Sequence, residues 1–328
     1  MNRGVFGELL GLITESERIC LIGHSSPDGD CIMSALALQA YLERLGKDVD
    51  IALAGKIPYN YDRYIDRNLI LTGDPHRDYD IAIAVDCASA ERLGIFSGIF
   101  YSAPLNVVID HHVTNTGFGT MHLIDTQVSS TCELIYNFFE SVNFKFDQKI
   151  AEYLYIGILT DTGKFRYPAT SGNTHRVVGR LLDMGIRPDE VYKYIFRNKP
   201  SGIAKACGAG MAGLKVYAGG SVAVARITRE IAALNDGRID EIDGLIDWLM
   251  DIRGVRISCV LKEISPESTK VSLRSENGFD LRRLADKYRG GGHPNAAGFI
   301  LHQSIAESEG LVAEELSDLA AIQPISPV

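Results

Sequence analysis

Short runs of apolar residues alternate with longer amphipathic segments through the first 160 residues. The runs are nearly continuous and rich in Ile, Val and Ala, so we expect each to form a buried strand; they lie at 18–24, 48–55, 79–86 and 105–112. The longer segments have apolar residues at helical spacing; they lie at 31–46, 129–142 and 149–161. Apolar strands that alternate with helices predict a parallel sheet covered on both faces.

The pattern changes after about residue 210, where strands become more frequent and helices shorter. The expected strands lie at 221–228, 256–264, 268–275 and 290–301. The stretch 197–210 is rich in Gly, Ala, Ser and Pro, which is typical of a linker. We therefore predict an α/β protein with a parallel-sheet domain at 1–196, a linker at 197–210 and a smaller α/β domain at 211–328.

Carboxylates and imidazoles follow the predicted strands of the first domain. They are His24, Asp28, Asp30, Asp86, Asp110, His111, His112 and Asp161. Ligands of parallel sheets bind at the carboxyl ends of the strands, and crowded carboxylates repel one another unless cations lie among them. Carboxylates and imidazoles without thiolates suit manganese, magnesium or ferrous iron better than structural zinc. Seven or more potential ligands exceed the needs of one ion, so we expect two ions that share a bridging carboxylate.

Each of these residues also has a structural interpretation. Asp28 or Asp30 could cap the helix that begins near Cys31. Asp86 could simply form a turn, and Asp161 could lie in a turn or at the C-terminus of a helix. The motif SSTCE at 129–133 has the form of a helix-capping arrangement, and we assign it no chemical role. The joint placement of the carboxylates and imidazoles at strand ends favours the metal site.

Five motifs in order carry a resemblance to a known family: GHSSPDGD, VDCASAERLG, VIDHH, GILTDTGKFRY and GGGHPNAAG. Over essentially its whole length the chain resembles the DHH phosphoesterase superfamily with its DHH-associated C-terminal domain. It looks most like the NrnA-type group of small oligoribonucleases, 3′-phosphoadenosine-5′-phosphate phosphatases and cyclic-dinucleotide phosphodiesterases. The resemblance implies two ion sites that share Asp86 as the bridge; the first takes His24, Asp28 and Asp86, and the second takes Asp30, Asp86, His111 and Asp161.

The resemblance also implies roles for residues that do not bind the ions. Asp110 would orient a histidine, and His112 would face the substrate phosphate, so Asp86, Asp110 and His112 form the expected catalytic set. The glycine run before His293 would be a turn whose backbone N–H groups bind an anion. The active site is expected in the cleft between the domains. The expected substrate-binding residues are Asn115, Arg274, Ser275, Gly291, Gly292 and His293.

The expected activity is hydrolysis of short nucleotides by two divalent ions, with Mn²⁺ favoured over Mg²⁺ or Fe²⁺. The substrates would be short oligoribonucleotides, linear dinucleotides or 3′,5′-bisphosphate nucleotides such as adenosine 3′,5′-bisphosphate (pAp). A cyclic di-AMP phosphodiesterase is the main alternative. A RecJ-like single-strand exonuclease, a pyrophosphatase or polyphosphatase, and a non-catalytic nucleotide sensor are less favoured.

Net charge, cysteine spacing and the length of the apolar runs indicate which partners the protein binds and in which compartment it is found. A net charge of −9 gives no broad attraction to long nucleic acid, so we expect short oligonucleotides or small phosphorylated nucleotides and no long duplex. The six cysteines form no CxxC pair. The N-terminus carries glutamates within its apolar pattern, and no apolar run reaches the roughly 18 residues of a membrane span. We expect a cytoplasmic protein without a membrane partner, and the resemblance is compatible with a homodimer.

Overall fold

The computed structural model describes residues 3–242, 244–276 and 278–321. The chain forms two compact units, Met1–Asn198 and Lys199–Val328. Among the helices of the described residues, none is both long enough and apolar enough to cross a membrane.

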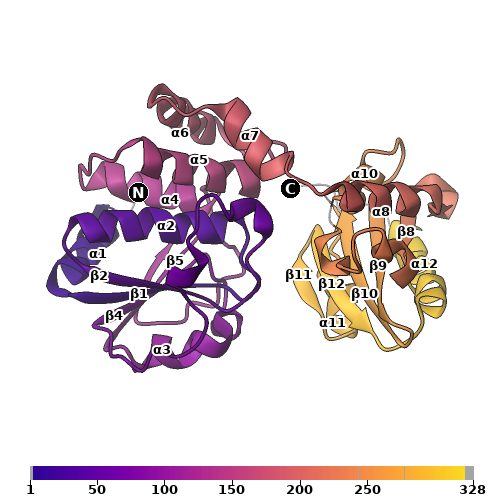
Figure 1. The fold of residues 1–328 in the computed structure, drawn as a ribbon, viewed down its shortest axis with the longest axis horizontal. Helices are drawn as coiled ribbons and strands as arrows, with labels where there is room; N and C mark the ends of the chain where they lie inside the picture. Colours follow the sequence, from indigo (N-terminus) through magenta and orange to yellow (C-terminus); the bar gives the residue numbers. More distant parts are fainter. Residues whose placement is uncertain (1–2, 243, 277, 322–328) are drawn as a thin grey trace. The chain divides into compact units, whose positions relative to one another are not determined.

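The first unit alternates strands and helices, as its apolar pattern predicts (Figure 1). Its strands are β1 (Arg18–Gly23), β2 (Asp48–Leu53), β3 (Ile70–Leu71), β4 (Ile81–Val85), β5 (Leu105–Asp110) and β6 (Met121–Ile124). Its helices are α1 (Arg3–Glu15), α2 (Gly29–Arg44), α3 (Ser97–Ser102), α4 (Thr131–Ser141), α5 (Gln148–Asp161), α6 (Gly172–Asp183) and α7 (Pro188–Phe196). Shorter 3₁₀ segments are η1 (Tyr59–Tyr61), η2 (Arg67–Leu69) and η3 (Ala90–Phe96).

In the described part of the first unit, six strands form one sheet in the order β3-β2-β1-β4-β5-β6. Every pairing in it is parallel. The predicted parallel sheet is therefore confirmed. Its two outermost strands, β3 and β6, were not predicted, because they are only two and four residues long.

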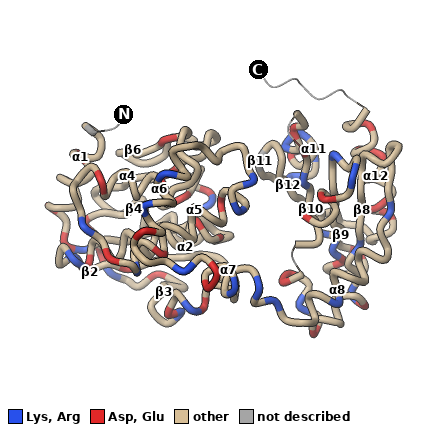
Figure 2. Tube along the Cα trace, turned by 90° about the horizontal axis from the view of Figure 1, so that it is seen from above, with Lys and Arg blue, Asp and Glu red and all other residues tan. Residues whose placement is uncertain are grey.

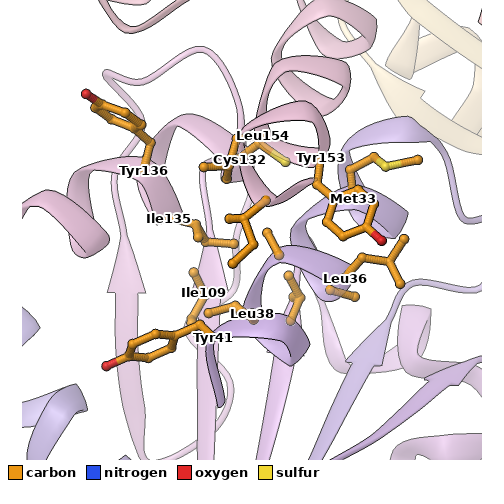
Figure 3. Packing of buried hydrophobic residues seen from close by; sticks show 14 of the residues in the cluster. Met33, Leu36, Leu38, Tyr41, Ile109, Cys132, Ile135, Tyr136, Tyr153 and Leu154 are labelled. Atoms are coloured by element: carbon orange, nitrogen blue, oxygen red, sulfur yellow. The ribbon is translucent and has the colours of Figure 1, made fainter. Parts of the chain in front are cut away.

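Alternate residues of the central strands enter two different hydrophobic cores. In β1, Ile19 and Leu21 join the core beneath α1, α2, α4 and α5, whereas Cys20 and Ile22 join the core beneath η3 and α3. Figure 3 shows the first of these cores, in which side chains of α2, α4 and α5 meet above the sheet, among them Leu38 and Ile135. Burial on both faces explains why these strands are apolar throughout.

The second unit contains a mixed sheet in the order β11-β12-β10-β9-β8-β7. Only the β8–β9 pairing is parallel among the described strands of this sheet. Its strands are β7 (Lys215–Tyr217), β8 (Val222–Ile227), β9 (Ile257–Ser265), β10 (Ser268–Ser275), β11 (Gly291–His293) and β12 (Ala296–Leu301). Its helical segments are α8 (Ser201–Ala212), η4 (Ala218–Gly220), α9 (Arg229–Ala233), η5 (Ile239–Glu241), α10 (Leu245–Met250), α11 (Arg282–Lys287) and α12 (Ile305–Ala321).

The stretch expected to be a linker, 197–210, is largely helical. Helix α8 begins at Ser201 and contacts β8 of the second unit. Its small residues permit this packing, because a Cβ at Gly210 would lie 2.8 Å from Ile227 Cδ1. The Gly and Ala content that suggested a linker instead lets a helix approach its neighbours closely.

The glycine run also differs from the expected open turn. Residues Gly291–His293 form β11, an edge strand paired antiparallel with β12. A Cβ at Gly292 would collide with the backbone of Ala296, and one at Gly290 with that of Gly298. Glycine is therefore required here for close strand pairing, and the turn itself falls at Pro294 and Asn295.

Candidate metal centre

Three neighbouring strands of the first unit are each followed directly by a predicted metal-binding residue. Strands β1, β4 and β5 lie side by side and run parallel. His24 follows the end of β1, Asp86 follows β4, and His111 follows β5. Because carboxyl ends of parallel strands meet at one edge of a sheet, these three side chains come together.

Two helix ends bring further carboxylates to the same edge. Asp28 is the N-cap of α2 and accepts a hydrogen bond from Cys31 N, so the capping interpretation of this residue is confirmed. Asp161 is the last residue of α5. The two helices meet at Gly29, where a Cβ would collide with Thr160 Oγ1. A glycine at this point is what lets the start of α2 reach the end of α5.

Asp86 lies at the middle of the cluster. Its Oδ2 is 3.7 Å from His24 Nε2, and its Oδ1 is 3.7 Å from His111 Nε2. The residue is buried and has a φ of 56°, a left-handed conformation that is uncommon outside glycine. Such backbone strain persists where the surrounding structure imposes it, often at functional sites. Each oxygen of one carboxylate thus faces a different imidazole.

The spacing between these groups suits a shared cation better than direct hydrogen bonds. His111 Nε2 lies 3.3 Å from Asp161 Oδ2, and His24 Nε2 lies 3.8 Å from Asp28 Oδ1. Within the described residues, His111 Nε2 is buried and has no hydrogen-bond partner. A buried polar atom without a partner is costly, and a divalent ion would remove that cost. The donor atoms of Asp30, His111 and Asp161 form one candidate group, and Asp86 belongs to two others.

The pKa shifts of three carboxylates in the cluster also indicate that cations bind here. Burial raises the pKa of Asp30 well above its ordinary value, and the charge of Asp86 raises it further. Burial also raises the pKa of Asp86, and burial with the charges of Asp30 and Asp86 raises that of Asp161. Ionised carboxylates this close are unfavourable without positive charge between them. The residues present therefore fit divalent cations.

Asp110 differs from the other carboxylates because its oxygens are held by hydrogen bonds from nearby groups. Asp110 Oδ1 lies 2.6 Å from His112 Nδ1 and accepts from His111 N at 2.8 Å. Its Oδ2 accepts from Asn115 Nδ2 at 2.6 Å. Burial opposes ionisation of Asp110, but its bond with His112 lowers its pKa below the ordinary value. Asp110 therefore fixes the orientation of the His112 ring and binds the backbone N–H of His111.

His112 is the one residue of the DHH sequence whose pKa rises. Burial acts to lower it, but the hydrogen bond with Asp110 and the charges of Asp86 and Asp110 raise the pKa to about 9. These two carboxylates therefore favour the protonated form of the His112 imidazole. A protonated imidazole is a hydrogen-bond donor of the kind that a phosphoryl oxygen accepts.

The first turn of α4 supports two carboxylates of the centre, which the sequence did not indicate. Thr131 N and Cys132 N donate to the two oxygens of Asp30 at 2.6 and 2.9 Å. The hydroxyl of Thr131 donates to Asp86 Oδ1 at 3.0 Å. A helix N-terminus carries a partial positive charge and free N–H groups that stabilise carboxylates. Asp30 keeps further lone pairs for an ion.

A buried glutamate fixes that helix turn in place. Glu133 Oε2 accepts from Ser129 N, Ser129 Oγ and Thr174 Oγ1, and its Oε1 accepts from Asn173 Nδ2. Ser130 caps α4 through Glu133 N. The motif SSTCE was thus interpreted correctly as a cap, but its sequence gave no sign that the capped turn holds Asp30 and Asp86.

Arg92 is a second residue that the sequence analysis missed. Its Nη2 lies 3.1 Å from His24 Nδ1, on the side of the ring opposite Asp28 and Asp86. The only signal for it was its place in the motif VDCASAERLG, after Asp86. It brings a positive charge to an edge dominated by carboxylates.

The expected substrate-binding residues are divided between the two units. Asn115, in the first, uses its side-chain Nδ2 to hold Asp110 and Cys87 O. In the second, Arg274 is half-buried on β10 and donates to Leu273 O. Ser275 Oγ accepts from Asn295 Nδ2 at 3.2 Å. Gly291 and Gly292 lie on β11, and the side chain of His293 is outside the described part of the chain.

Comparison with protein families identifies both units. Residues 18–158 match the model of the DHH family, N-terminal domain, and residues 219–321 match that of the DHHA1 domain. All the candidate metal-centre residues described above except Asp161 lie within the first match.

Individual relatives resemble the chain over most of its length. One is the bifunctional oligoribonuclease and PAP phosphatase NrnA of Thermus thermophilus, 29% identical over 283 residues, which are 86% of this chain and 84% of the relative. The NrnA protein of Bacillus subtilis is 26% identical over 94% of this chain and 96% of its own.

A solved structure, that of an exopolyphosphatase-related protein from Bacteroides fragilis, resembles the whole fold. It has a TM-score of 0.91, 25% identity and 98% coverage of both chains. With its DHH domain, its DHHA1 domain and the carboxylates and imidazoles of its metal centre, the chain belongs to the DHH family of metal-dependent phosphoesterases.

Proposed function

We propose that the chain is a manganese-dependent enzyme that hydrolyses short oligoribonucleotides and nucleoside 3′,5′-bisphosphates. The observation that carries the proposal is the position of Asp86, whose two oxygens face His24 and His111 within a buried carboxylate cluster. A bridging carboxylate between two ions is typical of phosphoester-cleaving sites. The substrate class is supported by the relatives from Thermus thermophilus and Bacillus subtilis, both named oligoribonuclease and PAP phosphatase.

The proposed ligand sets are those that the family resemblance implies, and both include Asp86. One ion would be held by His24, Asp28 and Asp86, and a second by Asp30, Asp86, His111 and Asp161. Oxygen and imidazole donors favour Mn²⁺, with Mg²⁺ and Fe²⁺ as alternatives. Cys31 Sγ also lies within 4.8 Å of donor atoms of His24 and Asp86, but burial raises the pKa of this thiol well above its ordinary value, which disfavours a thiolate ligand. When bound, such a pair lowers the pKa of water and stabilises charge on the phosphoryl oxygens.

The side chains around the ions would orient and protonate the substrate. His112, whose protonated form is favoured by its bond with Asp110, would donate to a phosphoryl oxygen or to the leaving oxygen. Asp110 holds the His112 ring, and Asn115 holds Asp110. We therefore propose that Asn115 acts by positioning Asp110 as well as by lining the phosphate site.

The second unit would supply nucleotide recognition. We propose that Arg274, Ser275, Gly291, Gly292 and His293 bind the phosphate or the nucleotide of the substrate. Support comes from the exposure of Gly291 and Gly292 on an edge strand, where every second backbone N–H points away from the sheet and is free to bind an anion. In this proposal the residues 1–196 carry catalysis and the residues from 211 onward carry substrate binding.

A hydrolysis panel read by chromatography tests the proposal. The manganese-loaded chain would be given a dinucleotide RNA, a five-nucleotide RNA, adenosine 3′,5′-bisphosphate, cyclic di-AMP and pyrophosphate. Asp86→Asn keeps the shape of the side chain and removes its charge, and Asp78→Asn is the matched control at an exposed position. We expect both RNAs and the bisphosphate to be cleaved by the wild type and by Asp78→Asn, but not by Asp86→Asn. Cleavage of pyrophosphate alone, or of none of them with manganese bound, would refute the proposal.

A further inference from the structure

A patch of aromatic and basic side chains lies on α7 and on the loop after α5. We call Lys164, Tyr192, Phe196 and Arg197 the α7 patch. The rings of Tyr192 and Phe196 are 5.1 Å apart, Lys164 Nζ lies 4.6 Å from the Phe196 centroid, and Arg197 Cζ lies 5.4 Å from that of Tyr192. Three of the four residues are exposed, and Phe196 is half-buried.

More residues of the same kind surround the patch. Arg63 Cζ lies 3.9 Å from the centroid of Tyr194, and Lys193 Nζ lies 5.8 Å from it. Arg166 and Tyr167 are exposed on the loop that contains Lys164. The basic residues Lys193, Arg197 and Lys199 lie at the end of α7 and just after it, although the net charge of the whole chain is −9 (Figure 2). The acidic residues of α7 lie in its first turn, at the opposite end of the helix.

Two routes through the structure connect the patch with the metal centre. Lys164 comes three residues after Asp161, within about 11 Å along the chain, and Lys164 N donates to Leu159 O, which keeps it at the end of α5. Asn60 Nδ2 donates to Ile195 O of α7. The neighbouring Tyr61 has its hydroxyl beside Gly29, 2.6 Å from where a Cβ of that glycine would lie. Both routes lie entirely within the first unit.

Aromatic rings and cations in this combination match single-stranded nucleic acid. Bases stack on aromatic side chains regardless of sequence, and Lys or Arg between the rings neutralises the phosphates. Neither the aromatic rings nor the basic side chains of the α7 patch belong to the proposed ligand sets of the metal centre. A mononucleotide at the ions has no second base to stack, whereas a chain of several nucleotides extends beyond them.

We infer that the α7 patch binds the nucleotides of an oligoribonucleotide that lie beyond the one whose phosphate reaches the metal centre. The inference rests on the proposed function and adds a site that distinguishes oligonucleotide from nucleoside bisphosphate substrates. Tyr192 and Phe196 stack on bases, and Lys164 and Arg197 pair with backbone phosphates.

Binding is the first test. The manganese-loaded full chain is titrated into a fluorescein-labelled five-nucleotide RNA with phosphorothioate linkages, which slow hydrolysis, and anisotropy is read. We expect Tyr192→Ala to raise Kd about fivefold or more, as loss of one stacking partner does, and Tyr192→Phe to restore binding. Arg197→Gln should lower the slope of log K against log salt by about 0.7. Tyr101→Ala, at an exposed tyrosine on α3, is the matched control and should change neither.

Turnover is the second test, with the five-nucleotide RNA and adenosine 3′,5′-bisphosphate compared for each variant. We expect the ratio of kcat/KM for RNA to that for the bisphosphate to fall about fivefold in Tyr192→Ala. Lys164→Asn should lower the ratio as well; asparagine suits the left-handed backbone there, where φ is 64°. Tyr101→Ala should leave the ratio unchanged.

Each other result contradicts the inference in its own way. RNA binding that is the same in all variants, with RNA still cleaved by the wild type, would overturn the inference and leave the proposed function standing. An equal loss on both substrates would mean that the patch acts through the metal centre. A wild-type chain that neither binds nor cleaves RNA would overturn the inference and the oligoribonuclease part of the proposed function together.

Discussion

Asp30 and Thr131 lie 101 positions apart in the chain and are joined by a hydrogen bond of 2.6 Å from Thr131 N to Asp30 Oδ2. The same threonine donates its hydroxyl to Asp86 Oδ1. One residue at the start of α4 thus holds two carboxylates of the metal centre, through two different groups. The arrangement of the centre depends on how α4 packs, as well as on the strands that carry most of its residues.

Replacing Thr131 by valine should weaken metal binding without unfolding the protein. Valine keeps the shape of threonine and the backbone N–H that holds Asp30, but removes the hydroxyl that orients Asp86. Loss of a group that orients a metal ligand typically costs about ten- to a hundredfold in affinity. Titration of Mn²⁺ followed by electron paramagnetic resonance would measure it. Thr131→Ser should restore most of the affinity, and equal loss in both variants would mean that the hydroxyl is not responsible.

Replacing His112 by asparagine should reduce turnover and spare metal binding. His112 is proposed to donate a proton or a hydrogen bond to the substrate, a contribution of about 100- to 10,000-fold in rate. The variant should bind Mn²⁺ with the affinity of the wild type, because His112 is absent from the proposed ligand sets. Steady-state kinetics with the five-nucleotide RNA and a Mn²⁺ titration together check this. A large loss of Mn²⁺ affinity would instead make His112 a ligand.

Removal of divalent ions should abolish hydrolysis and destabilise the first unit. EDTA treatment leaves the carboxylates around Asp86 without the cations that offset their repulsion. A ligand at a hundredfold excess over its Kd stabilises the folded state by about 2.7 kcal/mol. Scanning calorimetry with EDTA and with added Mn²⁺ should show a shift in the transition of the first unit alone. A shift of the second unit, or no shift at all, would contradict the assignment of the ions.

Asp80 should make the first unit sensitive to acid. Asp80 Oδ2 accepts hydrogen bonds from Glu17 N and Arg18 N at 2.9 and 2.8 Å, and these bonds lower its pKa below the ordinary value of 3.8. Its contribution is therefore complete above the unfolded pKa, near 3.9, and is lost as the pH falls through the lower folded pKa.

The variant Asp80→Ala tests whether Asp80 makes the free energy of unfolding depend on pH in this way. At pH 7 it should reduce the free energy of unfolding by about 1 kcal/mol, and the difference from wild type should shrink as the pH falls from 5 to 3. Thermal unfolding across this range would show it. A difference that stays constant with pH would mean that the charge of Asp80 contributes nothing to the effect.

Two helical glycines should respond oppositely to alanine. A Cβ at Gly157 in α5 would collide with Cys132 Sγ and lie 2.9 Å from Asp30 Oδ1, so Gly157→Ala should destabilise the protein by about 1–3 kcal/mol. At Gly179 in α6 nothing lies within 4 Å of the new Cβ, and alanine should stabilise by about 0.5–1 kcal/mol. Chemical denaturation of both variants checks the pair, and equal effects would contradict the packing described around Asp30.

Much of the fold was predictable because its pattern is local. Ile19 and Leu21 face one core and Cys20 and Ile22 the other, so the apolar runs of the parallel sheet stand out in the sequence. The position of His24 directly after such a run follows from the same pattern. By contrast, β3 has two residues and lies at the sheet edge, and α8 has the composition of a linker. Their formation depends on tertiary contacts that the local sequence does not encode.

The same division holds for the candidate site. The carboxylates and imidazoles were visible because each follows a predicted strand or ends a predicted helix. The contacts of Thr131 and Arg92 were not, because they depend on how separate segments pack against one another. A hydrogen bond from a backbone N–H, such as that of Cys132 to Asp30, cannot be recognised from the residue type, because every residue except proline has this group.

The arrangement of the sheet has a practical consequence for protein engineering. Every candidate metal-centre side chain described above follows a strand or comes from a helix end at the carboxyl edge, so the described turns that precede the strands of the first unit contribute none of these side chains. Leu45 and Gly46 lie on such a turn before β2, and Leu45 is 44% exposed. We therefore expect that a fluorescent label, a purification tag or an inserted domain placed there leaves the residues of the metal centre in position.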